Sequence, residues 1–293
     1  MNDLNMLATP DPELQEKIDK AIQIISGFNG AVVALSAGVD SSLVALFAQQ
    51  ALKGRSLAIT AVSESLALGE LEIAKKTASK IGIQHTAIET EEVHNANYLA
   101  NPTNRCYYCK NTLYTDLRRQ ADDLGFEAIL DGTQIDDFGD TRPGLLAAKE
   151  AGVRSPLAEA GFSKKDVREA ARLLGLEVWD KPAMPCLSSR VPHGETITVE
   201  KLSQVGEAED VIKRLTGARD IRVRHHGATA AVEISAREIS LLHPGAVLQK
   251  VENELKRIGF STMTVGPRKS PRPLKVASIG SDYVLPILND SGR

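Results

Sequence analysis

Apolar positions recur along the first two thirds of the chain at two different spacings. Spacings of three to four residues predict helices over 11–27, 41–52, 70–81, 107–124 and 164–174. Short apolar runs that end in polar or glycine residues predict strands over 31–36, 56–63, 84–90 and 127–133. Strands that alternate with helices predict an α/β fold, a doubly wound parallel sheet with helices on both faces. Such sheets bind ligands beyond the carboxyl ends of their strands.

The pattern changes after about residue 195. Helical spacing over 196–215 and 248–258 alternates with half-buried strand patterns over 219–226, 229–235 and 261–265. This segment predicts a smaller C-terminal α+β domain, which gives domains of 1–192 and 193–293. The tail from residue 266 is rich in proline and glycine.

Composition narrows the class of protein. The chain has 293 residues, 25% of them charged, and a net charge of −3, which argues against a nucleic-acid-binding surface. Neither a signal peptide nor an apolar run long enough to cross a membrane is visible. We therefore expect a cytoplasmic protein with no membrane or nucleic-acid partner.

The turn after the first strand, SAGVDSS, carries the first candidate chemistry. Gly38 permits close backbone approach, and the N–H groups that open the following helix carry partial positive charge. With the hydroxyls of Ser36, Ser41 and Ser42 they predict a phosphate or pyrophosphate site. Asp40 either bridges Mg²⁺ to that anion or caps the helix. The turn contains no Lys or Arg, which excludes a Walker loop, and it lacks a G-x-G-x-x-G pattern.

Three cysteines form the second group of residues with candidate chemistry. Cys106 and Cys109 stand at C-x-x-C spacing where a loop enters a helix, and Arg105 and Lys110 beside them favour thiolates. Cys186 stands far along the chain, and the odd count argues against a disulfide framework. Three thiolates and one open position suit a [4Fe–4S] cluster with a free iron. Buried apolar cysteines, or zinc with a histidine as fourth ligand, are the alternatives.

The turn resembles the PP-loop of ATP pyrophosphatases, commonly S-G-G-x-D-S. These enzymes split ATP into AMP and pyrophosphate and use the AMP to turn a carboxyl or carbonyl oxygen into a leaving group. Here the second position is Ala37. If the loop needs a glycine conformation there, Ala37→Gly is expected to bind ATP more tightly.

Beyond the loop, the chain resembles the LarE sulfurtransferase family from residue 31 to residue 265. The resemblance rests on D-G-x-x-x-D-D…R-P-G over 131–144, on C-L-S-S-R-V-P-H-G over 186–194, and on R-V-R over 222–224. It implies ATP-dependent insertion of sulfur into pyridinium-3,5-biscarboxylic acid mononucleotide, which yields the precursor of the nickel-pincer nucleotide. It also implies a homo-oligomer, whereas the sulfur donor stays open.

The resemblance also implies roles for individual residues. Cys106, Cys109 and Cys186 would hold a [4Fe–4S] cluster that supplies the sulfur, although some family members instead sacrifice one cysteine, here Cys186. Substrate phosphate and carboxylates need cations, for which Arg190, Arg222 and Arg224 are the candidates. Arg142 and Asp137 are further candidates to line the site. The remaining assignments are Ser36, Gly38, Asp40, Ser41 and Ser42 for pyrophosphate and Mg²⁺, Ser63 and Gly132 for the nucleoside, and Ser189, Arg190, Arg222, Arg224 and Glu209 for the substrate. Glu209 is expected on the polar side of its helix.

Three other functions share some of these features. A tRNA thiolation enzyme of the PP-loop class can carry a three-cysteine cluster, but it needs a basic RNA-binding surface. An ammonia-using amidotransferase needs no cysteine trio. A zinc-stapled nucleotide-binding module would release no pyrophosphate.

Overall fold

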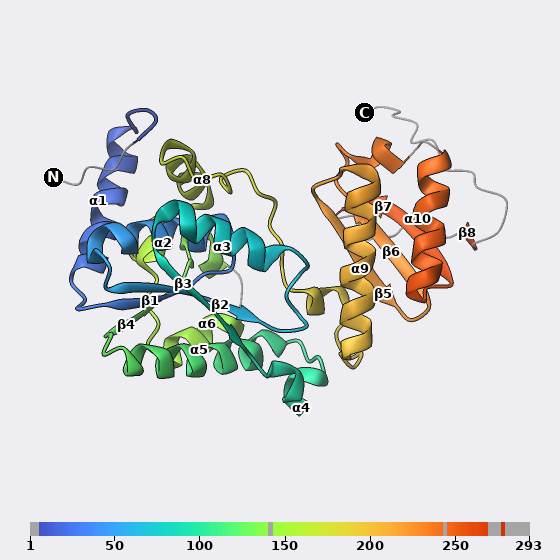
Figure 1. Ribbon diagram of the computed structural model, residues 1–293, viewed down its shortest axis with the longest axis horizontal. Coiled ribbons are helices and arrows are strands. Elements are labelled where there is room, and N and C mark those ends of the chain that lie inside the picture. The colour runs from blue at the N-terminus through green and yellow to red at the C-terminus, as the bar shows by residue number, and fades with distance from the viewer. Residues whose placement is uncertain (1–5, 140–142, 243–244, 269–276, 279–293) are drawn as a thin grey trace. The chain divides into compact units, whose positions relative to one another are not determined.

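The computed structural model describes residues 6–139, 143–242, 245–268 and 277–278. The described chain forms two compact units (Figure 1). The first comprises the described residues up to Leu187 together with His193–Val199, and the second comprises Ser188–Pro192 and the described residues from Glu200 onward. The sequence-based division after residue 192 places 188–192 in the first domain, whereas their contacts group them with the second unit.

Four parallel strands form the sheet of the first unit, in the order β3-β2-β1-β4. The strands are β1 (Ala31–Ala34), β2 (Ser56–Val62), β3 (Gln84–Glu89) and β4 (Ala128–Leu130). The predicted α/β fold with a parallel sheet is therefore confirmed. Because β1 lies between β2 and β4, the turn that follows it opens at the middle of the sheet edge, where such sheets bind ligands.

Helices cover both faces of this sheet (Figure 1). On one face pack α1 (Pro12–Ser26), α2 (Val39–Leu52), α3 (Glu70–Ile81) and α8 (Lys164–Leu173), and on the other α5 (Arg105–Asp123) and α6 (Pro143–Glu150). Two one-turn helices, α4 (Ala96–Leu99) and α7 (Pro156–Glu159), complete the unit among the described residues. The sequence pattern did not predict α4, α6 or α7.

Alternation along β1 divides the core into its two layers. Ala31 and Val33 join the apolar cluster under α1, α2 and α8, whereas Val32 joins the cluster under α5 and α6. All three are fully buried. A strand buried on both faces shows a continuous apolar run, as the sequence does here.

The second unit is the predicted smaller α+β unit. Its sheet has the order β5-β6-β7-β8, with an antiparallel β5–β6 hairpin, a parallel β6–β7 pair and an antiparallel β7–β8 pair. Gly227 turns the hairpin with a φ of +60°. Its elements are α9 (Val199–Thr216), β5 (Ile221–His226), β6 (Thr229–Ile234), α10 (Gly245–Ile258), β7 (Thr262–Pro267) and β8 (Ala277–Ser278).

Element ends depart from the sequence pattern by a few residues. Helix α2 begins at Val39, two residues before its predicted start, and Gly38 occupies the N-cap position. Most of the proline- and glycine-rich tail, and Arg142, lie outside the described residues. No helix within the described ranges is both long enough and apolar enough to cross a membrane.

Candidate functional site

The turn between β1 and α2 is tied together by its own hydroxyls. The Ser36 N–H donates to Ser41 Oγ at 3.1 Å, and the hydroxyls of Ser41 and Ser42 donate to the Gly38 carbonyl at 3.2 and 2.8 Å. No side chain caps the start of α2. The N–H groups of its first turn are thus left for an anion, as the sequence predicts.

Ala37 adopts the conformation that the family pattern assigns to glycine. Its φ is +58°, in the left-handed region, and its side chain is fully buried. A residue with a Cβ pays about 1–2 kcal/mol for this conformation. The turn therefore does need a glycine-like backbone at position 37, and the chain reaches it with alanine.

Gly132 acts at this turn through its lack of a side chain. A Cβ on Gly132 would lie 2.7 Å from the Ser41 nitrogen and 2.9 Å from the Asp40 Cβ. The backbone just after β4 therefore packs directly against the start of α2. The structure gives Gly132 a packing reason that is independent of any contact with a nucleoside.

Replacing Gly132 by alanine is expected to weaken ATP binding at least about tenfold, because the added Cβ displaces the first turn of α2. A nucleotide titration measures this, with circular dichroism as the test of folding. Gly27→Ala is the matched control, since a Cβ there meets nothing closer than 3.4 Å, and its affinity should stay within about twofold of the parent. Unchanged affinity in Gly132→Ala would contradict this close approach.

Lysines that are remote in the sequence supply cations to the turn. Lys164 donates to both carboxylate oxygens of Asp40, at 2.8 and 2.6 Å. Lys181 donates to the Ala37 carbonyl at 2.9 Å and to Glu70 at 2.6 Å. Both lysines line a cavity of about 190 Å³ together with Ser36 and Gly38. Sequence reasoning missed them because they follow the loop by more than 120 positions and no spacing rule connects them to it.

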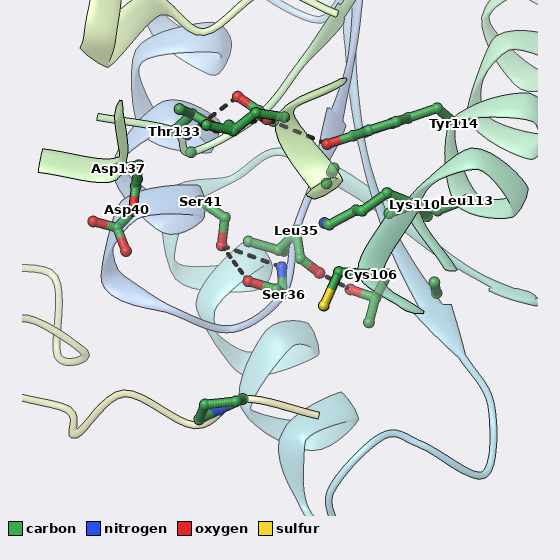
Figure 2. A pocket seen from close by; sticks show the side chains of 18 of the residues that line it. Leu35, Ser36, Asp40, Ser41, Cys106, Lys110, Leu113, Tyr114, Thr133 and Asp137 are labelled. Carbon is green, nitrogen blue, oxygen red and sulfur yellow. Dashed lines mark hydrogen bonds between the residues drawn. The ribbon is translucent and has the colours of Figure 1, made fainter. Parts of the chain in front are cut away.

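A larger cavity of about 610 Å³ opens beside the turn. Figure 2 shows Ser36, Ser41 and Asp40 on one side of it and Cys106 and Lys110, both from α5, on the other. The volume suits a nucleotide-sized ligand. The cavity therefore places the predicted phosphate turn and one of the predicted cysteines around one space.

Asp131 and Tyr114 are polar residues that line this cavity. Tyr114 and Thr133, two of the partners of Asp131, are seen in Figure 2. Asp131 accepts from the Tyr114 hydroxyl at 3.2 Å, from Thr133 Oγ1 at 2.8 Å and from Ser155 Oγ at 2.7 Å. Burial raises the pKa of Tyr114 to about 12, so its hydroxyl stays a donor at neutral pH. The Thr133 N–H also donates to Asp131 at 3.1 Å, so four donors fix this carboxylate in place.

Lys110 projects its ammonium into the same region. The Nζ atom lies 5.5 Å from the centre of the Tyr114 ring. Burial lowers the pKa of Lys110, but Tyr114, Cys109 and Asp131 together outweigh burial and raise it. Lys110 therefore carries a positive charge into the cavity. Sequence reasoning considered this residue only as a neighbour of the cysteines.

Ser63, which the sequence analysis assigns to nucleoside binding at the end of β2, makes its contacts outside the large cavity. The Ser63 hydroxyl donates to Glu92 at 2.5 Å, and Ser65 donates to the same carboxylate oxygen at 2.9 Å. Ser63 does not line the large cavity, whereas Thr60, earlier on β2, does. Asp137 lines it too, and there its carboxylate accepts from the Gln134 N–H at 3.0 Å.

The three cysteines do not form disulfides, and their exposure differs: Cys106 is exposed, whereas Cys109 and Cys186 are half-buried. Burial, with contributions from Cys186 and Glu92, raises the pKa of Cys109 to about 12. The expectation that Arg105 and Lys110 favour thiolates is wrong for Cys109. Burial outweighs Lys110, and the buried Arg105 donates instead to Asn101.

The donor chemistry of the three thiols suits an iron–sulfur cluster, but their arrangement does not yet form a binding site. Among the described residues, no three cysteine, histidine or acidic side chains stand close enough together to hold a metal ion. Cys106 and Cys186 both contribute to the raised pKa of Cys109. Binding a cluster requires the thiols to converge further than they do here.

The predicted substrate residues gather in the second unit. Arg190 donates to Glu209 through Nε at 2.8 Å and Nη2 at 3.1 Å, and both side chains are at most 2% exposed. Glu209 also accepts from the Val223 N–H at 3.0 Å. The prediction that Glu209 lies on the polar side of its helix is wrong, because its carboxylate turns inward to pair with Arg190.

Arg222 and Arg224 share one face of β5, as their spacing predicts. Arg224 donates to the Ser189 carbonyl at 2.8 Å and pairs with Glu233 at 3.1 Å. Burial, then Arg190 and Arg224, lower the pKa of Arg222, whose Nε lacks a hydrogen-bond partner within the described part of the chain. A half-buried guanidinium beside like charges is arranged to receive an anion.

Comparison with known proteins then defines the family. The chain is 35% identical over 237 residues to the pyridinium-3,5-bisthiocarboxylic acid mononucleotide synthase of Lactiplantibacillus plantarum, and the match covers 80% of this chain and 84% of that protein. This chain belongs to the LarE family. The resemblance predicted from the sequence motifs is thereby confirmed, and the chain is an ATP-dependent sulfurtransferase of the PP-loop class.

Other similarities are consistent with the LarE family. A family model described as NAD synthase matches residues 13–107, which contain the phosphate turn. An uncharacterized protein of Synechocystis sp. is 46% identical over 86% of this chain and 94% of its own length. A tRNA-specific 2-thiouridylase MnmA of Azorhizobium caulinodans is 29% identical over 85% of this chain and 71% of its own length.

Proposed function

We propose that this chain replaces carboxylate oxygen by sulfur in pyridinium-3,5-biscarboxylic acid mononucleotide, on the route to the nickel-pincer nucleotide. The observation that carries the proposal is the cavity of about 610 Å³ that both the phosphate turn and Cys106 line. A site that activates a carboxylate with ATP and then delivers sulfur needs both groups around one space. The similarity to the synthase of Lactiplantibacillus plantarum supports this choice of substrate.

The activation step follows from the chemistry of the carboxylate. A carboxylate oxygen attacks the α-phosphorus of ATP, the bond from that phosphorus to the pyrophosphate oxygen breaks, and an acyl-adenylate forms. A sulfur nucleophile then adds to the carbonyl carbon, and the carbon–oxygen bond to AMP breaks. Without adenylation the leaving group would be oxide, so the AMP makes the substitution feasible.

The turn residues have defined roles in this step. The N–H groups at the start of α2 and the hydroxyls of Ser36 and Ser41 would hold the departing pyrophosphate. Mg²⁺, when bound, would neutralise phosphate charge, and the oxygen ligands it prefers are available at Asp40. Lys164 donates to both oxygens of that carboxylate and would compete with Mg²⁺ for it. Lys110 would offer its charge to the adenylate from the opposite wall.

For the sulfur source we propose the three cysteines acting together. A [4Fe–4S] cluster held by Cys106, Cys109 and Cys186 would supply a sulfide at the iron that lacks a protein ligand. The support for this source is that none of the three thiols is in a disulfide and that Cys106 and Cys186 both influence the pKa of Cys109. Sacrifice of Cys186 alone is the alternative. A separate donor must restore the sulfur after each turnover.

We assign the binding of the substrate's phosphate and carboxylates to the arginines of the second unit. Arg222 has an unused Nε and a pKa lowered by its neighbours, so an anion would relieve both burial and repulsion. The buried Arg190–Glu209 pair and Ser189 support the strand that presents it. A cytoplasmic location and a homo-oligomer complete the proposal.

Pyrophosphate exchange tests the substrate class. The account expects exchange of labelled pyrophosphate into ATP only when pyridinium-3,5-biscarboxylic acid mononucleotide is present, because adenylation needs its carboxylate. Transfer RNA is the comparison substrate, since the relative in Azorhizobium caulinodans is a tRNA-specific enzyme. Exchange that depends on tRNA, with a salt-sensitive tRNA shift in a gel, would overturn the proposal in favour of tRNA thiolation.

A further inference from the structure

The turn between β1 and α2, where we expect pyrophosphate to bind, contains a buried residue with a strained backbone torsion. Ala37 holds a φ of +58° with its side chain fully buried, although L residues other than glycine rarely adopt that conformation. The hydrogen bonds of Ser41 and Ser42 tie down Ser36 and Gly38, on either side of Ala37, but none of them involves the Ala37 carbonyl. Strained backbone persists only where its surroundings enforce it, so a contact to that carbonyl would add directly to the support of this conformation.

Lys181 provides that contact. Its ammonium donates to the Ala37 carbonyl at 2.9 Å, so it acts on the peptide that carries the unusual torsion. The same ammonium pairs with Glu70 at 2.6 Å. The two side chains are only 15% and 9% exposed, so water competes weakly for either contact. A charged donor makes a stronger hydrogen bond to a carbonyl than a neutral one.

The two anchors of this contact are themselves fixed. Glu70 is the first residue of α3, where the partial positive charge of the helix start favours a carboxylate. The segment that carries Lys181 is held by Arg168, which donates to the Trp179 carbonyl at 2.7 Å and the Lys181 carbonyl at 3.0 Å. The Ala37 carbonyl is therefore tied to two separate elements through one ammonium.

We propose that Lys181 and Glu70 are positioning residues that hold Ala37 in the left-handed conformation, and so keep the phosphate turn ready for ATP without the usual glycine. The inference rests on ATP binding at this turn. It differs from a direct charge effect, in which Lys181 simply attracts phosphate. The two accounts predict opposite results for Glu70 and different results for Ala37.

A double-mutant cycle tests the proposal by nucleotide titration of the full chain. Lys181→Met is expected to weaken ATP binding about tenfold in the parent and about threefold or less in an Ala37→Gly background, where glycine needs no support. Ala37→Gly alone should bind ATP at most about threefold more tightly, because the contact already offsets most of the strain. Equal losses in both backgrounds would overturn the proposal, since a direct charge on phosphate does not depend on residue 37.

Two further variants sharpen the result. Glu70→Gln removes a negative charge near an anion site, so electrostatics alone predicts tighter ATP binding. Loss of positioning predicts weaker ATP binding instead. Tighter binding would therefore overturn the proposal. Lys164→Met is the matched control, since Lys164 contacts Asp40 and not Ala37, and its effect should be the same in the parent and in the Ala37→Gly background. Thermal melts establish that each variant is folded. A parent chain that does not bind ATP would count against the proposed function itself.

Discussion

Replacing Cys186 by serine is expected to abolish thiocarboxylate formation, by at least roughly three orders of magnitude, while substrate-dependent pyrophosphate exchange continues. The reason is that the turn after β1 performs activation and the cysteines perform sulfur delivery. Exchange reports the first process, and mass analysis of the product reports the second. A Cys186→Ser variant that still makes thiocarboxylate would show that the sulfur reaches the substrate by another path.

Cys106→Ser and Cys109→Ser provide the matched comparison. If the three thiols hold one cluster, each substitution should cause the same loss, and the anaerobically purified parent should be brown with about four irons per chain. If Cys186 alone is sacrificed, the other two variants should keep one turnover, and the parent should be colourless. The serine hydroxyl matches the size of the thiol, so folding is not expected to separate the variants.

Replacing Glu209 by glutamine is expected to lower the free energy of unfolding by about 3–5 kcal/mol. Glu209 is 2% exposed and Arg190 is fully buried, so the substitution removes the negative charge that pairs with the guanidinium through two hydrogen bonds in the interior. The Val223 N–H loses a charged acceptor as well. Urea unfolding followed by circular dichroism measures the change.

The adjacent residue offers a control for this result. Asp210 pairs with Arg214 at 2.9 Å on the exposed side of the same helix, with the two side chains 43% and 67% exposed. Asp210→Asn should therefore cost about 0.5 kcal/mol or less. A Glu209→Gln variant no less stable than Asp210→Asn would mean that the Arg190–Glu209 pair is hydrated, which contradicts its burial.

Most of the fold could be predicted from the sequence, because its signals are local. The apolar run at 31–34 and the helical spacing over 70–81 each indicate their own element, and both lie where the pattern placed them. Helix α6 was not predicted because it begins with Pro143 and Gly144, two residue types that are typical of loops, and α4 was not predicted because its four residues are too few to show a period. Some observed element ends differ from the predicted ones because a capping residue, such as Gly38 before α2, sets the end.

The site was predictable only as far as motifs reach. The phosphate turn and the R-V-R strand could be recognised from residue type and spacing. Lys164 and Lys181 did not, since they reach Asp40 and Ala37 only through the packing of the unit. Burial reversed two expectations: it raised the pKa of Cys109, and it turned Glu209 inward toward Arg190.

The central claim is that ATP activates a carboxylate so that sulfur can replace its oxygen. The most direct test is a mass measurement of pyridinium-3,5-biscarboxylic acid mononucleotide, and of the chain itself, after anaerobic turnover with ATP, Mg²⁺ and inorganic sulfide. The account predicts one sulfur in place of one oxygen for each AMP formed, with every cysteine of the chain intact. A substrate of unchanged mass despite AMP formation would contradict it.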